Sequence, residues 1–128
     1  MNKEFIPYEQ ALELKELGFD EPCMFPYHRN NTEYIDSAHI ELANYNATEK
    51  LVSAVLYQQA FRWFREKYNL FGCIDLQVCT PSHWFIRIDK IEINDYLYHS
   101  EDKDIRFNTY EEAELACLIK LIEIVKNK

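Results

Sequence analysis

Residues 56–70 show the clearest division between apolar and polar positions in the chain. At about 100° per residue, as in an α-helix, nearly all the polar residues of this segment fall on one half of the helical surface. The other half is formed by Leu56, Tyr57, Ala60, Phe61, Trp63, Phe64, Tyr68 and Leu70. Extending the helix backwards would put Leu51 and Val55 on the polar side, so the helix is predicted to begin near Ser53, a suitable N-cap residue. Its aromatic face is predicted to pack in the core.

Two further helices are predicted from the residues at their ends. Residues 8–17 form an amphipathic segment that stops at Gly18, which can supply the left-handed residue common after a helix. The last helix is predicted to begin after Thr109, because Thr109 and Glu112 form a T-x-x-E capping box. Ile119 points away from the broad apolar face of this helix. A single exposed isoleucine is ordinary, so it predicts no interface.

Alternation of apolar and polar residues predicts the strands. Residues 73–79 and 83–91 alternate on either side of a Thr-Pro-Ser turn, a pattern typical of a β-hairpin with one buried face. A second pair is predicted from residues 23–28 and 33–40, which flank the turn sequence RNNT. The predicted order is α-β-β-α-β-β-α. It corresponds to an α+β fold, with an antiparallel sheet of about four strands packed by three helices.

Two segments allow more than one interpretation. Residues 41–54 contain the sequence N-A-T-E, which resembles a capping box, but the hydrophobic phase fails there and residues 49–54 are equally compatible with an extended segment. Residues 92–106 are polar and rich in acids, and their composition fits either a loop or a short helix. The length of 128 residues fits a single globular domain over residues 1–128.

The composition favours some classes of protein over others. The net charge of −8 comes from 22 acidic and 14 basic residues, whereas proteins that bind nucleic acid usually have a basic surplus. No apolar run reaches the roughly 18 residues that cross a bilayer, and the first residues lack the apolar core of a signal peptide. A cytoplasmic location without membrane contact is therefore predicted. The four cysteines are widely spaced and form no C-x-x-C pair, so neither a metal nor a cofactor is predicted.

The candidate binding residues come from two groups. Arg62 and Arg65 lie on the polar face of the aromatic helix, where arginines three residues apart can grip a carboxylate or phosphate, and Lys67 follows them. Tyr96 and Tyr98 lie among acids, and tyrosine is enriched in protein interfaces. These five residues form the candidate partner-binding or anion-binding face. The simpler interpretations are a solvated helix face and a solvated loop.

Three segments resemble small uncharacterised proteins encoded by phages and prophages of Bacteroidota. They are YEQALELKELGFDEPC at residues 8–23, QQAFRWFREKYNL at residues 58–70 and TYEEAELACLIKLIEIVK at residues 109–126. They follow one another in the expected order and cover a little over a third of the chain. The resemblance implies a phage or mobile-element origin but no activity, and it carries over no catalytic or binding residue.

These observations predict a non-enzymatic binding module that acts on a bacterial protein partner. The chain contains no G-x-S-x-G, H-E-x-x-H or glycine-rich phosphate loop, so no catalytic residue is predicted. Two alternatives stay open. One is a nucleic-acid-associated protein that uses the Arg62 and Arg65 face, and the other is a small-molecule-binding protein or enzyme with a pocket beside the hairpin of residues 73–91. The oligomeric state is not predicted.

Overall fold

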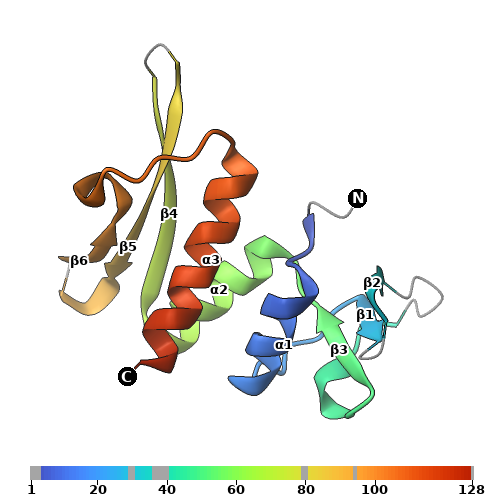
Figure 1. Ribbon diagram of the computed structural model, residues 1–128. Coiled ribbons are helices and arrows are strands. Elements are labelled where there is room, and N and C mark those ends of the chain that lie inside the picture. Colours follow the sequence, from blue (N-terminus) through green and yellow to red (C-terminus); the bar gives the residue numbers. More distant parts are fainter. Residues whose placement is uncertain (1–3, 29–30, 36–40, 79–80, 94, 128) are drawn as a thin grey trace. The chain divides into compact units, whose positions relative to one another are not determined.

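The computed structural model describes residues 4–28, 31–35, 41–78, 81–93 and 95–127 (Figure 1). The chain falls into two compact units, which we call the first unit (Met1–Tyr57) and the second unit (Gln58–Lys128). The prediction of a single domain over residues 1–128 stays a prediction.

The first unit combines one helix with a three-stranded antiparallel sheet. Helix α1 (Tyr8–Glu16) precedes the strands β1 (Phe25–His28), β2 (Asn31–Ile35) and β3 (Leu51–Ala54), which are ordered β2-β1-β3 in the sheet. The helix packs on β3. Gly18 follows α1 with φ of 96°, as its sequence position predicted. Strands β1 and β2 pair in antiparallel fashion, which confirms the predicted pairing of residues 23–28 with residues 33–40 as far as Ile35. Residues 36–40 lie outside the described part.

The prediction that the aromatic helix begins near Ser53 is wrong. Ser53 belongs to β3, which pairs with β1, and the helix begins at Tyr57. The backbone N–H of Ser53 donates to Asn46 Oδ1 over 2.8 Å, and Asn46 Nδ2 donates to the carbonyl of Phe19 over 2.9 Å. The Asn46 side chain thus takes the place of a neighbouring strand beside β3. Of the two interpretations of residues 49–54, the extended one is confirmed for Leu51–Ala54.

Two serines among the described residues are completely buried, and they differ in hydrogen bonding. Ser53 Oγ has no partner, whereas Ser100 Oγ accepts the backbone N–H of Ile86 over 2.9 Å. We expect Ser53→Ala to raise the free energy of unfolding by about 1 kcal/mol, because it removes an unpaired buried hydroxyl. Ser100→Ala should lower it by about 1–3 kcal/mol, because it leaves the Ile86 N–H unpaired. Urea denaturation of both variants tests this, and a loss of stability in Ser53→Ala would contradict it.

The second unit places two helices on one face of another antiparallel sheet. It contains β4 (Leu70–Gln77), β5 (His83–Lys90), β6 (Asp95–His99) and α3 (Tyr110–Lys126), with the strands ordered β4-β5-β6. It also contains α2 (Tyr57–Tyr68) except for its first residue, Tyr57, which ends the first unit. The predicted hairpin is confirmed as β4 and β5, and its register pairs Gly72 with Ile88. A Cβ atom built on Gly72 would meet side chains of both α3 and α2, so the two helices cover the same face of β4.

The α+β class is confirmed, but the strands are distributed differently from the prediction. They form two sheets of three strands instead of one sheet of about four. The additional strands are β3 and β6. Residues 92–106, predicted as a loop or a short helix, contain both β6 and a short 3-10 helix at Ser100–Lys103. The sequence of β6, DYLYH, has Tyr96, Leu97 and Tyr98 in a row and therefore lacks the alternation that predicts a strand.

The helices of the second unit bury the faces that their patterns indicated. Trp63 and Phe64 of α2 are buried, with ring centroids 5.1 Å apart in an edge-to-face arrangement. Thr109 Oγ1 accepts the N–H of Glu112 over 3.1 Å, which confirms the predicted start of α3. Ile119 is 43% exposed, as expected for a residue opposite the apolar face.

Candidate functional site

The predicted arginine face of α2 lies at the surface, but both arginines have neighbours of their own. Arg62 Nε lies 3.8 Å from Glu66 Oε1, and both side chains are more than half exposed. Arg65 Cζ lies 5.9 Å from the ring centroid of Phe71 on β4, in a cation–π arrangement. An incoming carboxylate or phosphate would compete with these contacts. The pair is therefore not preorganised as an anion clamp.

The other predicted residues lie on different elements. Lys67 Nζ lies 5.0 Å from the ring of Trp63 on the same helix. Tyr98 belongs to β6, the opposite edge of the sheet from β4, and its ring lies 4.6 Å from Lys120 Nζ of α3. Tyr96 also belongs to β6, and its side chain lies outside the described residues. The five predicted residues are thus divided between α2 and β6.

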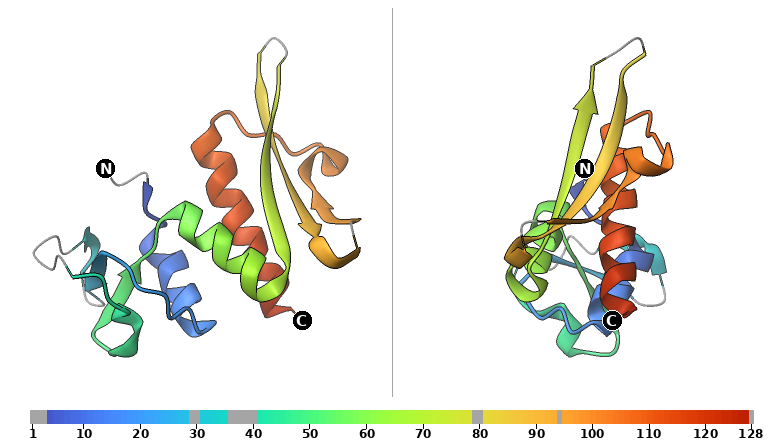
Figure 2. Two further views of the ribbon diagram at one scale, coloured as in Figure 1. Left: turned by 180° about the vertical axis from the view of Figure 1, so that it is seen from behind. Right: turned by 90° about the vertical axis from the view of Figure 1, so that its left-hand side faces the viewer.

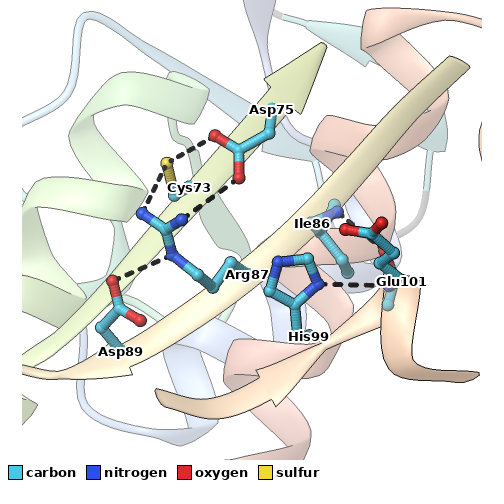
Figure 3. A network of polar contacts seen from close by, with 8 residues as sticks. Cys73, Asp75, Ile86, Arg87, Asp89, His99 and Glu101 are labelled. Carbon is cyan, nitrogen blue, oxygen red and sulfur yellow. Dashed lines mark hydrogen bonds and ion pairs between the residues drawn. The ribbon is translucent and has the colours of Figure 1, made fainter. Parts of the chain in front are cut away.

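A polar cluster lies on the β4 and β5 strands, centred on Arg87 (Figure 3). Arg87 Nε lies 3.2 Å from Asp89 Oδ2, and Arg87 Nη1 lies 3.4 Å from Asp75 Oδ2. Arg87 Nη2 also approaches the sulfur of Cys73 at 3.8 Å. The side chains of Arg87, Asp75 and Asp89 are 35%, 42% and 28% exposed. The cluster therefore lies at the surface, on a face that the strands hold rigidly.

The register of the sheet explains how this cluster forms. Cys73 pairs with Arg87 across β4 and β5, and Arg87 pairs with His99 across β5 and β6, so the three side chains share one face. Asp75 follows Cys73 by two residues on β4, and Asp89 follows Arg87 by two residues on β5, so both aspartates lie on that face as well. Alternation in the sequence shows that Arg87 and Asp89 share a side. Only the register shows that Cys73 and Asp75 lie beside them.

The chemistry of the cluster suits binding better than covalent catalysis. Burial, and then the charge of Asp75, raise the pKa of the Cys73 thiol, so it stays protonated near neutral pH and is a poor nucleophile. Arg87 already binds two carboxylates and is not an open site for an oxyanion. Within the described ranges, Cys73, Cys23 and Cys117 form no disulfide, and no three His, Cys, Asp or Glu residues are grouped to hold a metal.

A second surface feature is the hairpin of β4 and β5, which projects beyond the rest of the second unit in every view (Figures 1 and 2). Strand β6 pairs with β5 only along Arg87–Lys90, and Phe107 forms an isolated bridge to Trp84. The hairpin therefore extends past these neighbours beyond the Leu76–Trp84 pair. Leu76 is 47% exposed and Val78 is 82% exposed on this projecting part. We call residues 76–78 and 81–84 the hairpin arm.

The start of α3 adds acids and an aromatic ring beside β4 and β5. Tyr110 packs edge-to-face on Trp84 of β5, with ring centroids 5.3 Å apart, and it remains 42% exposed. Burial, and then the charge of Glu114, raise the pKa of the Tyr110 hydroxyl. Burial, and then the charge of Glu111, also raise the pKa of Glu114. An added cation would relieve the repulsion between these carboxylates.

The comparisons with known proteins add no further assignment. No family model, curated protein or solved structure matches the chain. In the part of the chain that the structure describes, no helix has the length and apolar character needed to cross a membrane.

Proposed function

We propose that this protein is a non-enzymatic binding module that acts on a bacterial protein partner and contacts it with the hairpin arm. The observation that carries the proposal is the exposure of Val78 and Leu76, 82% and 47%, at the projecting end of the second sheet. Leu76 is the next-to-last residue of β4 and Val78 directly follows the strand, so two exposed apolar residues lie close together at this end of the hairpin. Phe107 bridges to Trp84, so the hairpin is two-stranded only beyond the Leu76–Trp84 pair. Such a two-stranded end gains little stability by itself, which favours a role in recognition.

Charge and surface chemistry agree with a protein partner. The first unit has ten acidic and four basic residues, and the second has twelve and ten. The excess of acidic residues opposes binding to the phosphates of nucleic acids and favours binding to basic protein surfaces. The proposed bacterial partner and the phage or mobile-element origin rest on the resemblance of residues 8–23, 58–70 and 109–126. A cytoplasmic location is part of the same proposal.

The test compares three forms of the full chain as bait in bacterial lysate. We expect a specific protein to be retained by the wild type and by Ile119→Asp, and retention to fall about tenfold or more for Val78→Asp, because a charge at the centre of an apolar contact is costly. Ile119 is the matched control, since it is an exposed apolar residue on α3. Equal retention by all three forms, or retention by none, would contradict the proposal. Circular dichroism verifies that each form is folded.

A further inference from the structure

The outer edge of β5, the edge opposite β4, is closed by two segments. Strand β6 pairs with one half of this edge. Beyond β6, the backbone N–H of Ile86 donates to Ser100 Oγ over 2.9 Å. The backbones of Trp84 and Phe107 exchange two hydrogen bonds, of 2.9 and 3.0 Å. Residues 100–107 therefore cover the edge next to the hairpin arm, where the segment after β6 crosses the hairpin (Figure 1). We call these residues the strap.

The strap is anchored at its ends and exposed between them. Among its residues, all of which the structure describes, Ser100 is the only buried one, and residues 101–106 are exposed. Backbone hydrogen bonds in which Asp104 donates to Glu101 and Ile105 donates to Ser100 hold the strap in a turn. Asp104 has φ of 55°, in the left-handed region that residues with a Cβ rarely adopt. A segment with so little burial opens at a lower free energy than the buried strands and helices around it.

We infer that the strap opens while β4 and β5 stay paired, and that its opening regulates the contact made by the hairpin arm. Opening releases the outward backbone groups of Trp84 and Ile86, so the part of β5 that a partner can reach then extends from the arm to Ile86. Unpaired N–H and C=O groups on a strand edge are a template for an extended segment of another protein. The closed strap thus limits the contact to the arm, and the open strap adds backbone hydrogen bonds to it. The inference rests on the proposed function, because it concerns the regulation of the same contact surface.

Hydrogen exchange of the full chain, measured by NMR and corrected for intrinsic rates, tests the opening. Trp84 and Ile86 point their N–H groups outward, so Phe85 between them points its N–H group to β4. We expect the amides of Trp84, Ile86 and Phe107 to exchange at least about tenfold faster than that of Phe85, with little dependence on low urea, because a local opening exposes little surface. Ser100→Ala removes one anchor and should speed exchange at Trp84 and Phe107 by a further factor of about ten. Equal protection of Trp84, Phe85 and Ile86 would overturn the inference.

Ile122→Val is the matched control for Ser100→Ala. Ile122 is 2% exposed and belongs to α3, outside the strap, so loss of one methylene group lowers the stability of the second unit without touching either anchor. Exchange at Trp84 and Phe107 should stay within about twofold of the wild type, because the strap opens without global unfolding. Equal acceleration by Ile122→Val and Ser100→Ala would mean that the strap opens only when the whole unit unfolds, and the inference would then be wrong.

Retention of a partner from bacterial lysate, with a limiting amount of bait, tests the regulation. The apparent affinity of a scarcely populated binding form rises with its population, so Ser100→Ala should retain about threefold or more of the partner held by the wild type or by Ile122→Val. Adding Val78→Asp to Ser100→Ala should abolish this gain. A partner that depends on Val78 but gains nothing from Ser100→Ala overturns the regulation and leaves the binding module in place. Retention of no partner contradicts the proposed function instead, and the exchange pattern alone then decides whether the strap opens.

Discussion

Leu118→Ala should lower the free energy of unfolding by about 2–5 kcal/mol. Leu118 is completely buried, and it belongs to α3, the helix that packs on β4 and β5. Truncation to alanine removes apolar contacts and leaves a cavity that the sheet and helix can only partly fill. Urea denaturation followed by circular dichroism measures the change, and the slope with urea shows whether the unfolded state has changed as well.

The neighbouring residue provides the control. Ile119 has a similar volume and belongs to the same helix, but its side chain is 43% exposed. Ile119→Ala should therefore change the free energy of unfolding by no more than about 0.5 kcal/mol. Equal losses for the two variants would mean that α3 does not pack on the sheet through the face described here.

Gly72→Ala should lower the free energy of unfolding by about 1–3 kcal/mol. An added Cβ would lie 2.9 Å from Cys117 Sγ, 3.1 Å from Leu121 Cδ1 and 3.4 Å from Phe61 Cδ1. Alanine normally stabilises a strand relative to glycine by about 0.5–1 kcal/mol. The sign of the net effect therefore shows whether the helices approach the strand so closely that a methyl group has no space.

The source of this effect can be isolated with a second substitution. Cys117→Ala removes the sulfur that is nearest to the added Cβ, so the double variant should be less destabilised than the sum of the two single variants by about 0.5–3 kcal/mol. Denaturation of all four proteins gives this coupling energy. Strict additivity, or a Gly72→Ala variant that is more stable than the wild type, would contradict the close approach of β4 and α3.

The predictions that succeeded used signals within one element. The start of α3 follows from Thr109 and Glu112, whose side-chain and backbone groups meet within a single turn. The β4 and β5 hairpin follows from alternation on both sides of a short turn. In both cases the residues that determine the structure are close in sequence, so a pattern in the sequence contains the necessary information.

The failures concern contacts between distant segments. The hydrophobic pattern of the aromatic helix fails upstream of Ser53, and this places the predicted helix start near that residue. Only the pairing of β3 with β1 shows that Ser53 belongs to a strand. The cluster around Arg87 depends on register, and a slip of one residue would move Cys73 to the opposite face. The candidate face on α2 was recognisable as exposed, but the contact between Arg65 and Phe71 requires the following strand to turn back beside the helix.

The division into two units affects how spectroscopy reports on this protein. Both tryptophans, Trp63 and Trp84, belong to the second unit, and the first unit contains tyrosines but no tryptophan. Tryptophan emission consequently follows the second unit, and a first unit that unfolds earlier would leave much of that emission unchanged. A single cooperative domain over residues 1–128 requires tyrosine and tryptophan signals to change together during unfolding.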